Sequence, residues 1–210
     1  MVNSQIRKTT AQEKEETVKA FTDQCVWLRL IYNESCSLFN KTNESRLHLL
    51  EEVASNFFHD LNKIFNDYLL LGICKLTDPA RDGKNDRYDN LTVEYILELV
   101  GQPTANQLGL DQLSKKIHSI RDRLRDARNK ILAHSDKHIM ISQKVIGAFP
   151  KETGDDFWSN LQEFVNGINN HYFRNGPYPL DAVNPSGAED LVRALKKSVH
   201  YDDFFKGKSR

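Results

Sequence analysis

The chain of 210 residues lacks the cysteine pattern of a disulfide-stabilised or zinc-binding protein. It has three cysteines, Cys25, Cys36 and Cys74. No two of them form a CxxC motif, and an odd number of cysteines cannot all pair in disulfides within one chain. This usage argues against a disulfide framework and suits a reducing compartment. Cys25 and Cys36 fall on apolar helix faces, where we expect them to act as small hydrophobic residues.

Long apolar runs and a secretory signal are also missing. The longest apolar run, residues 68–74, is far too short to span a bilayer, and the first residues hold no apolar signal region. We therefore expect a soluble cytoplasmic protein that does not bind a membrane. The chain also has no Walker loop, dinucleotide-binding fingerprint or nucleophile elbow, which disfavours NTPases, dehydrogenases and esterases.

The chain has no net charge either, because 29 basic residues balance 29 acidic ones. Attraction for a nucleic acid must therefore come from a local patch. Basic residues outnumber acidic ones between Lys115 and Lys137. On charge alone, a solvated helix face with Asp–Arg pairs explains this stretch better than a binding patch does.

Helical periodicity dominates what is present, and it predicts an all-α fold with no alternating strand. Thr10 with Glu13, and Ser186 with Glu189, fit capping boxes. The helix that ends before Pro79 has an apolar face so broad that we expect partners on two sides, as for the central helix of a bundle.

Trp27 and Trp158 lie beside apolar stripes and are expected in the core. The predicted helices span about residues 10–39, 47–77, 92–100 (with Pro103 preventing continuation), 110–134, 155–172 and 186 onward.

A rigid Gly-Pro-Tyr-Pro linker at residues 176–179 suggests two parts. We expect residues 1–175 to form the helical bundle. Residues 176–210 would form a linker and a helix packed on the bundle or on a dimer partner.

The most informative segment is residues 128–134, Arg-Asn-Lys-Ile-Leu-Ala-His, near the end of a predicted helix. The guanidinium of Arg128 suits a phosphate, and the imidazole of His134 exchanges protons near neutral pH. Such a pair can promote attack of an RNA 2′-hydroxyl on the neighbouring phosphate without a metal. Asn129 adds an amide that can orient the imidazole or a phosphate oxygen.

Arg128 and His134 lie at opposite margins of the buried stripe, roughly 60° to either side of Ile131 on an ideal helix. They need not meet within one chain. If the helix packs against its own copy about a two-fold axis, two copies of each residue line one cleft. DNA, which lacks the 2′-hydroxyl, would not be cut.

A structural role is the alternative for this segment, because a histidine near a helix C-terminus interacts well with the last carbonyls.

A metal site is disfavoured. His134 and His138 have the spacing of helical zinc ligands, but Ser135 and Asp136 indicate that the helix is ending there. Asp136 is better placed to orient His134 or to serve as a turn residue. We expect no metal and no cofactor.

The segment from Arg128 to Asp136 resembles the signature of the HEPN superfamily, in which an arginine precedes a histidine after a gap of about four to six positions. More narrowly, three other stretches resemble the phage abortive-infection branch of that superfamily. They are Leu76–Pro79, Asn90–Thr92 and the tail Ala194–Lys197 with Tyr201–Phe205.

The resemblance implies an antiparallel HEPN-type bundle with long central helices and a C-terminal helical extension. It also implies a homodimer formed through the motif helix, with metal-independent endoribonuclease activity on RNA as a toxin or antiphage effector. An antitoxin or another defence protein is the further expected partner. HEPN-like modules that bind without cutting give the alternative, a non-catalytic module for a protein, RNA or nucleotide. The residues expected at the site are catalytic Arg128, His134 and Asn129, supporting Asp136 and Asp78, and the RNA-binding candidates Arg121, Arg125 and Lys130.

Overall fold

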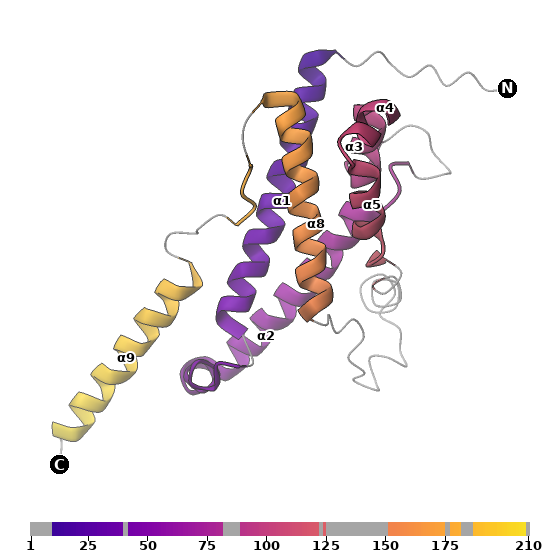
Figure 1. Cartoon of the computed structure of the whole chain (residues 1–210). Helices are drawn as coiled ribbons and strands as arrows, with labels where there is room; N and C mark the ends of the chain where they lie inside the picture. The colour runs from indigo at the N-terminus through magenta and orange to yellow at the C-terminus, as the bar shows by residue number, and fades with distance from the viewer. Residues whose placement is uncertain are drawn as a thin grey trace, which may run out of the picture. The chain divides into compact units, whose positions relative to one another are not determined.

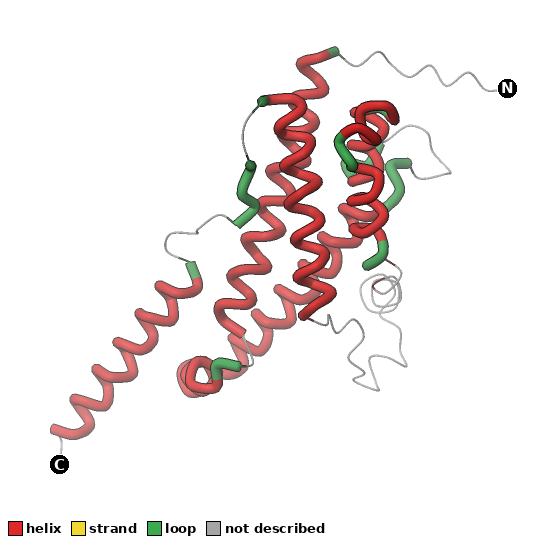
Figure 2. The backbone as a smooth tube through the Cα atoms, in the orientation of Figure 1, coloured by secondary structure: helices red, strands yellow, loops and turns green. Residues whose placement is uncertain are grey.

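The computed structural model describes residues 10–39, 42–81, 89–121, 124, 151–174, 177–181 and 187–208. Within these ranges every regular element is a helix, so the all-α prediction is confirmed (Figures 1 and 2). None of these helices is both long enough and apolar enough to cross a bilayer. The helices are α1 (Ala11–Phe39), α2 (Glu44–Thr77), α3 (Val93–Val100), α4 (Gln102–Gln107), α5 (Leu110–His118), α8 (Lys151–Phe173) and α9 (Ala188–Lys208).

The starts of α1 and α3 follow local sequence signals. Thr10 and Glu13 form the predicted capping box: the Thr10 amide donates to Glu13 Oε2 at 2.7 Å, and the Glu13 amide donates to Thr10 Oγ1 at 3.2 Å. Thr92 caps α3 through its side chain. Gly101, with φ of 85°, ends α3 in a conformation that favours glycine.

The starts of α4 and α9 involve two residues that the sequence singled out, Pro103 and Glu189. The helix expected at residues 92–100 does not continue past Gly101, as predicted, and Pro103 lies in the first turn of the separate helix α4, where a missing amide hydrogen costs nothing. Ser186, the predicted capping-box partner of Glu189, lies outside the described residues, and the Glu189 carboxylate binds Arg46 at 2.8 and 3.0 Å. The Ala188 amide at the start of α9 instead donates to Glu34 of α1.

The second predicted helix is present but bent. Ala54 has φ of −161° and ψ of 69°, which interrupts the helical path of α2. The apolar face of α2 was expected to be covered on two sides, but Phe57 and Ile64 are exposed. Phe58 provides the buried side instead. The expectation of burial on two sides is therefore wrong for this part of α2.

The chain divides into two compact units, residues 1–27 with 70–180 and residues 28–69 with 181–210, so α1 and α2 each contribute to both. In the first unit, α8 runs antiparallel to the first half of α1 (Figure 1). Phe21 and Phe164 meet edge to face with ring centroids 6.0 Å apart. α5 packs on α8, and α3 and α4 pack on α5. The division into residues 1–175 and 176–210 stays a prediction.

The second unit has its own apolar cluster, which joins the second half of α1, the first part of α2 and the start of α9. Phe39 and Phe65 meet edge to face at 6.2 Å beside this cluster. Arg29 pairs with Asp181 in the same unit. The buried members of the cluster are Leu38, Leu49, Leu50, Phe58, Ala188 and Val192.

Cysteine and tryptophan burial agrees only in part with expectation. Cys25 is buried as predicted, and burial raises the pKa of its thiol. Cys36 is exposed, so its predicted role as a buried hydrophobic residue is wrong. Trp158 is buried as predicted, whereas Trp27 is 54% exposed and does not belong to the core.

Candidate functional site

The Arg–His segment lies outside the described residues. This holds for the catalytic candidates Arg128, Asn129 and His134, for Asp136, and for the RNA-binding candidates Arg125 and Lys130. The structure describes the helix that leads into the segment, and two of the named residues, Arg121 and Asp78.

α5 is held firmly in the core of the first unit. Leu110 and Ile117 are fully buried, and Ile120 and Leu124 continue the buried side beyond the end of the helix. Gly167 of α8 allows close approach, because a Cβ there would lie 3.0 Å from Leu110 Cδ2. Packing against α8 therefore anchors the start of the segment predicted to carry the site.

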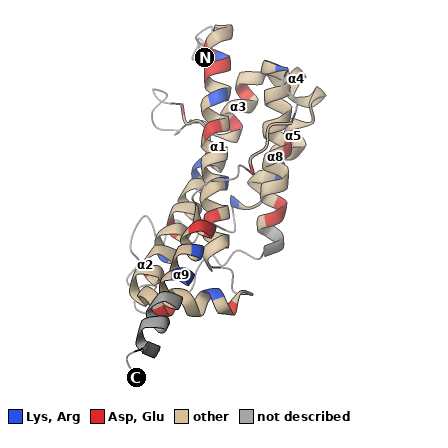
Figure 3. Ribbon diagram, turned by 90° about the vertical axis from the view of Figure 1, so that its left-hand side faces the viewer, with Lys and Arg blue, Asp and Glu red and all other residues tan. Residues whose placement is uncertain are grey.

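The last turn of α5 is basic. Lys115 and Lys116 are exposed, and Arg121 follows as a half-buried residue. Nδ1 of His118 lies 2.8 Å from the Ser114 carbonyl oxygen and 3.2 Å from Ser114 Oγ, so the imidazole is held against its own helix. Along α1, by contrast, acidic and basic residues are mixed (Figure 3). The cationic end of α5 therefore agrees with the basic stretch read from the sequence.

Asp78 lies at the end of α2, and the segment around it is tied to α3. The Asn90 amide donates to the Ala80 carbonyl at 2.7 Å, and Asn90 Nδ2 donates to the Pro79 carbonyl at 3.1 Å. The Ala80 amide donates to Glu94 of α3 at 3.0 Å. Two of the stretches that resemble the abortive-infection branch are thus joined directly. The supporting role of Asp78 itself stays a prediction.

Arg81 strengthens the same junction. Its guanidinium contacts Glu98 of α3 at 2.7 Å and Asp89 at 3.3 Å. Because two carboxylates already bind this guanidinium, we assign Arg81 a structural role.

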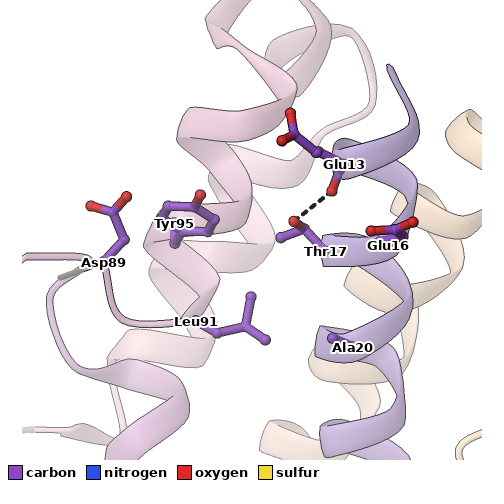
Figure 4. Close-up of a pocket in the computed structure, with 7 residues that line it drawn as sticks. All are labelled: Glu13, Glu16, Thr17, Ala20, Asp89, Leu91 and Tyr95. Carbon is purple, nitrogen blue, oxygen red and sulfur yellow. Dashed lines mark hydrogen bonds between the residues drawn. The ribbon is translucent and has the colours of Figure 1, made fainter. Parts of the chain in front are cut away.

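A shallow groove of about 390 Å³ opens between α1 and α3 (Figure 4). Burial, with the nearby Asp89 carboxylate as a further cause, raises the pKa of the Tyr95 phenol at its edge. Three carboxylates and no basic side chain line the groove, so it would repel a phosphate rather than bind one. Its lining residues are Glu13, Glu16, Thr17, Ala20, Asp89, Leu91 and Tyr95.

The sequence did not predict a pair of buried polar residues in the first unit, Thr22 and Asn169. Asn169 Nδ2 donates to Thr22 Oγ1 and to the Val165 carbonyl, both at 2.9 Å. Thr22 and Asn169 both lie among apolar positions of their helices, and only tertiary packing pairs them. Over the described ranges, no group of three histidine, cysteine, aspartate or glutamate residues is placed to hold a metal ion.

Comparison with known proteins gives one family match. The family model HEPN_AbiU2, described as AbiU2, matches residues 11–193. No curated protein and no solved structure matches the chain. The matched range includes α1 to α8, the first residues of α9 and the Arg–His segment.

Proposed function

The chain belongs to the HEPN_AbiU2 family, a HEPN-like abortive-infection family, and from this membership we propose that it is a metal-independent endoribonuclease. In this proposal it acts as a homodimeric toxin or antiphage effector, in keeping with the defence context of the family. The observation that carries the proposal is the Arg128–His134 segment, which lies inside the matched range and follows the basic end of α5.

The chemistry assigns one role to each group. The ribose 2′-oxygen attacks phosphorus, the bond from phosphorus to the 5′-oxygen breaks, and a cyclic phosphate forms. A neutral imidazole of His134 takes the 2′ proton, and a protonated imidazole, from the partner's His134, donates to the leaving 5′-oxygen. The Arg128 guanidinium stabilises the charge that builds on the phosphoryl oxygens, and Asn129 orients the neighbouring groups.

The surroundings support a cleft for RNA at the end of α5. Lys115, Lys116 and Arg121 bring positive charge to the entry of the segment. Arg125 and Lys130 are proposed to extend this phosphate-binding surface. The groove between α1 and α3 is lined by carboxylates and is unsuited to a polyanion.

Cleavage of RNA in the presence of a chelator tests the proposal. Wild-type protein is expected to cut RNA to cyclic-phosphate ends and to leave DNA of the same sequence intact. Arg128→Ala and His134→Ala should each lower the rate by about 100-fold or more, because each removes a group that acts in the transition state. Arg193→Ala and His59→Ala remove the same residue types at exposed positions and should leave the rate unchanged.

The alternative is a non-catalytic module of the same fold. Identical products from wild type and both motif variants would contradict the nuclease and favour this module.

A further inference from the structure

One face of α2 exposes large apolar side chains. Phe57 is 61% exposed, Ile64 60% and Tyr68 44%. With half-buried Leu61 they lie within about 60° of one another around the helix axis, given about 100° of turn per residue. All of them follow the bend at Ala54, so they share one continuous helical segment. A contiguous apolar row of this kind marks an interaction surface, whereas scattered apolar residues do not.

The spacing of the apolar residues in this row is the same in both directions along the helix. Phe57 and Tyr68 are equally far from the midpoint of residues 62–63, and so are Leu61 and Ile64. A two-fold axis through that midpoint pairs two α2 helices antiparallel. It places Phe57 against the partner's Tyr68 and Leu61 against the partner's Ile64. A symmetric interface requires a surface that is complementary to itself, and this row has that property.

The charges beside the row favour the same arrangement. Asp60 and Lys63 are exposed along one margin, and Lys63 Nζ contacts Asp67 of its own chain at 2.6 Å. In an antiparallel pair, Lys63 lies near the partner's Asp60. A two-fold parallel pair would instead place this margin of the two helices on opposite sides of the contact, so that Lys63 and the partner's Asp60 would not meet. Exposed charges of this kind select orientation more than they add affinity.

We propose that this α2 face, made by Phe57, Leu61, Ile64 and Tyr68, binds the same face of a second copy of the chain in an antiparallel pair. The contact uses a surface different from the motif helix and does not depend on RNA cleavage. A chain that also pairs through the motif helix would assemble beyond a dimer.

Sedimentation of the full-length protein tests the contact. Ile64→Glu and Phe57→Glu are each expected to halve the mass of the assembly, because a buried carboxylate would lie in the apolar row. Asn66→Glu is the matched control: it adds the same charge at an exposed position on the opposite side of α2 and should leave the mass unchanged. Urea denaturation of each variant establishes that it is folded.

Cross-linking tests the orientation. In a Cys36→Ser background, which removes the exposed thiol, Lys63→Cys should couple to its own copy through a short bismaleimide. Asn56→Cys lies on the same side of α2 but should not couple, because the antiparallel pair separates the two copies by about 20 Å along the axis at 1.5 Å per residue. Three results would overturn the proposal: a monomeric wild type, an unchanged mass for Ile64→Glu, or equal coupling at both cysteines.

Discussion

Thr92 shows how one hydroxyl in a short motif supports the start of a helix. It is buried, and its Oγ1 accepts a hydrogen bond from the Tyr95 amide at 3.2 Å at the start of α3. Thr92→Ala is expected to lower the free energy of unfolding by about 1 kcal/mol, the usual effect of losing such a cap. Thr92→Ser keeps the hydroxyl and should lose less. Urea denaturation measures both, and equal losses would contradict the capping role.

Local hydrogen bonds at single residues could be predicted from the sequence, whereas distant ones could not. Thr10 and Glu13 are three positions apart, so their spacing alone predicted the capping box. Glu189 had the same spacing signal but binds Arg46, and Asn169 binds Thr22 far along the chain. Arg46 comes close to Glu189 only when the helices pack, and a charged hydrogen bond of this kind is stronger than one to a backbone amide.

Helical periodicity predicted the long elements because their apolar stripes are continuous. The same continuity hid the bend in α2: the apolar spacing passes through Ala54 without a change of phase, so nothing in the pattern marks it. The periodicity also did not predict which edge of the broad apolar stripe of α2 is covered by other helices. Phe58 is buried while its neighbour Phe57 is exposed, and packing partners decide between them.

The attachment of α9 is expected to depend on pH. A hydrogen bond from Arg46 lowers the pKa of Glu189 below its ordinary value of 4.5. A hydrogen bond from Arg29 likewise lowers the pKa of Asp181 below 3.8. A carboxylate whose pKa is lowered by folding stabilises the folded state when it is ionised. This contribution is fully present above the ordinary values and is lost as the pH falls through the lowered ones.

Comparing wild type with Glu189→Gln isolates this effect. The difference in their free energies of unfolding should be largest at neutral pH and should shrink as the pH falls below about 4.5. In an Arg46→Met background, the same substitution should show no such pH dependence, because the partner is absent. A wild-type difference that stays constant from pH 7 to pH 3 would contradict the expected link between Arg46 and Glu189.

At the scale of the whole molecule, the sequence specifies each half of the candidate site but not how the halves meet. Arg128 and His134 fall on opposite margins of one predicted helix, so a shared cleft requires a second copy. Periodicity within one chain carries no information about that pairing. The resemblance to HEPN proteins supplied the expectation of a second copy; the family match shows the family, and the pairing stays a prediction.

The two compact units have separate apolar cores, so we expect them to open separately. Val192 is buried in the cluster of the second unit, whereas its neighbour Leu191 is 40% exposed. Val192→Asp should lower the opening free energy of residues 28–69 by about 2 kcal/mol or more, because a charge enters an apolar cluster. Hydrogen exchange should detect this while α8 keeps its protection. Leu191→Asp, the matched control, should change neither unit, and an equal loss of protection in α8 after Val192→Asp would show that the two cores open as one.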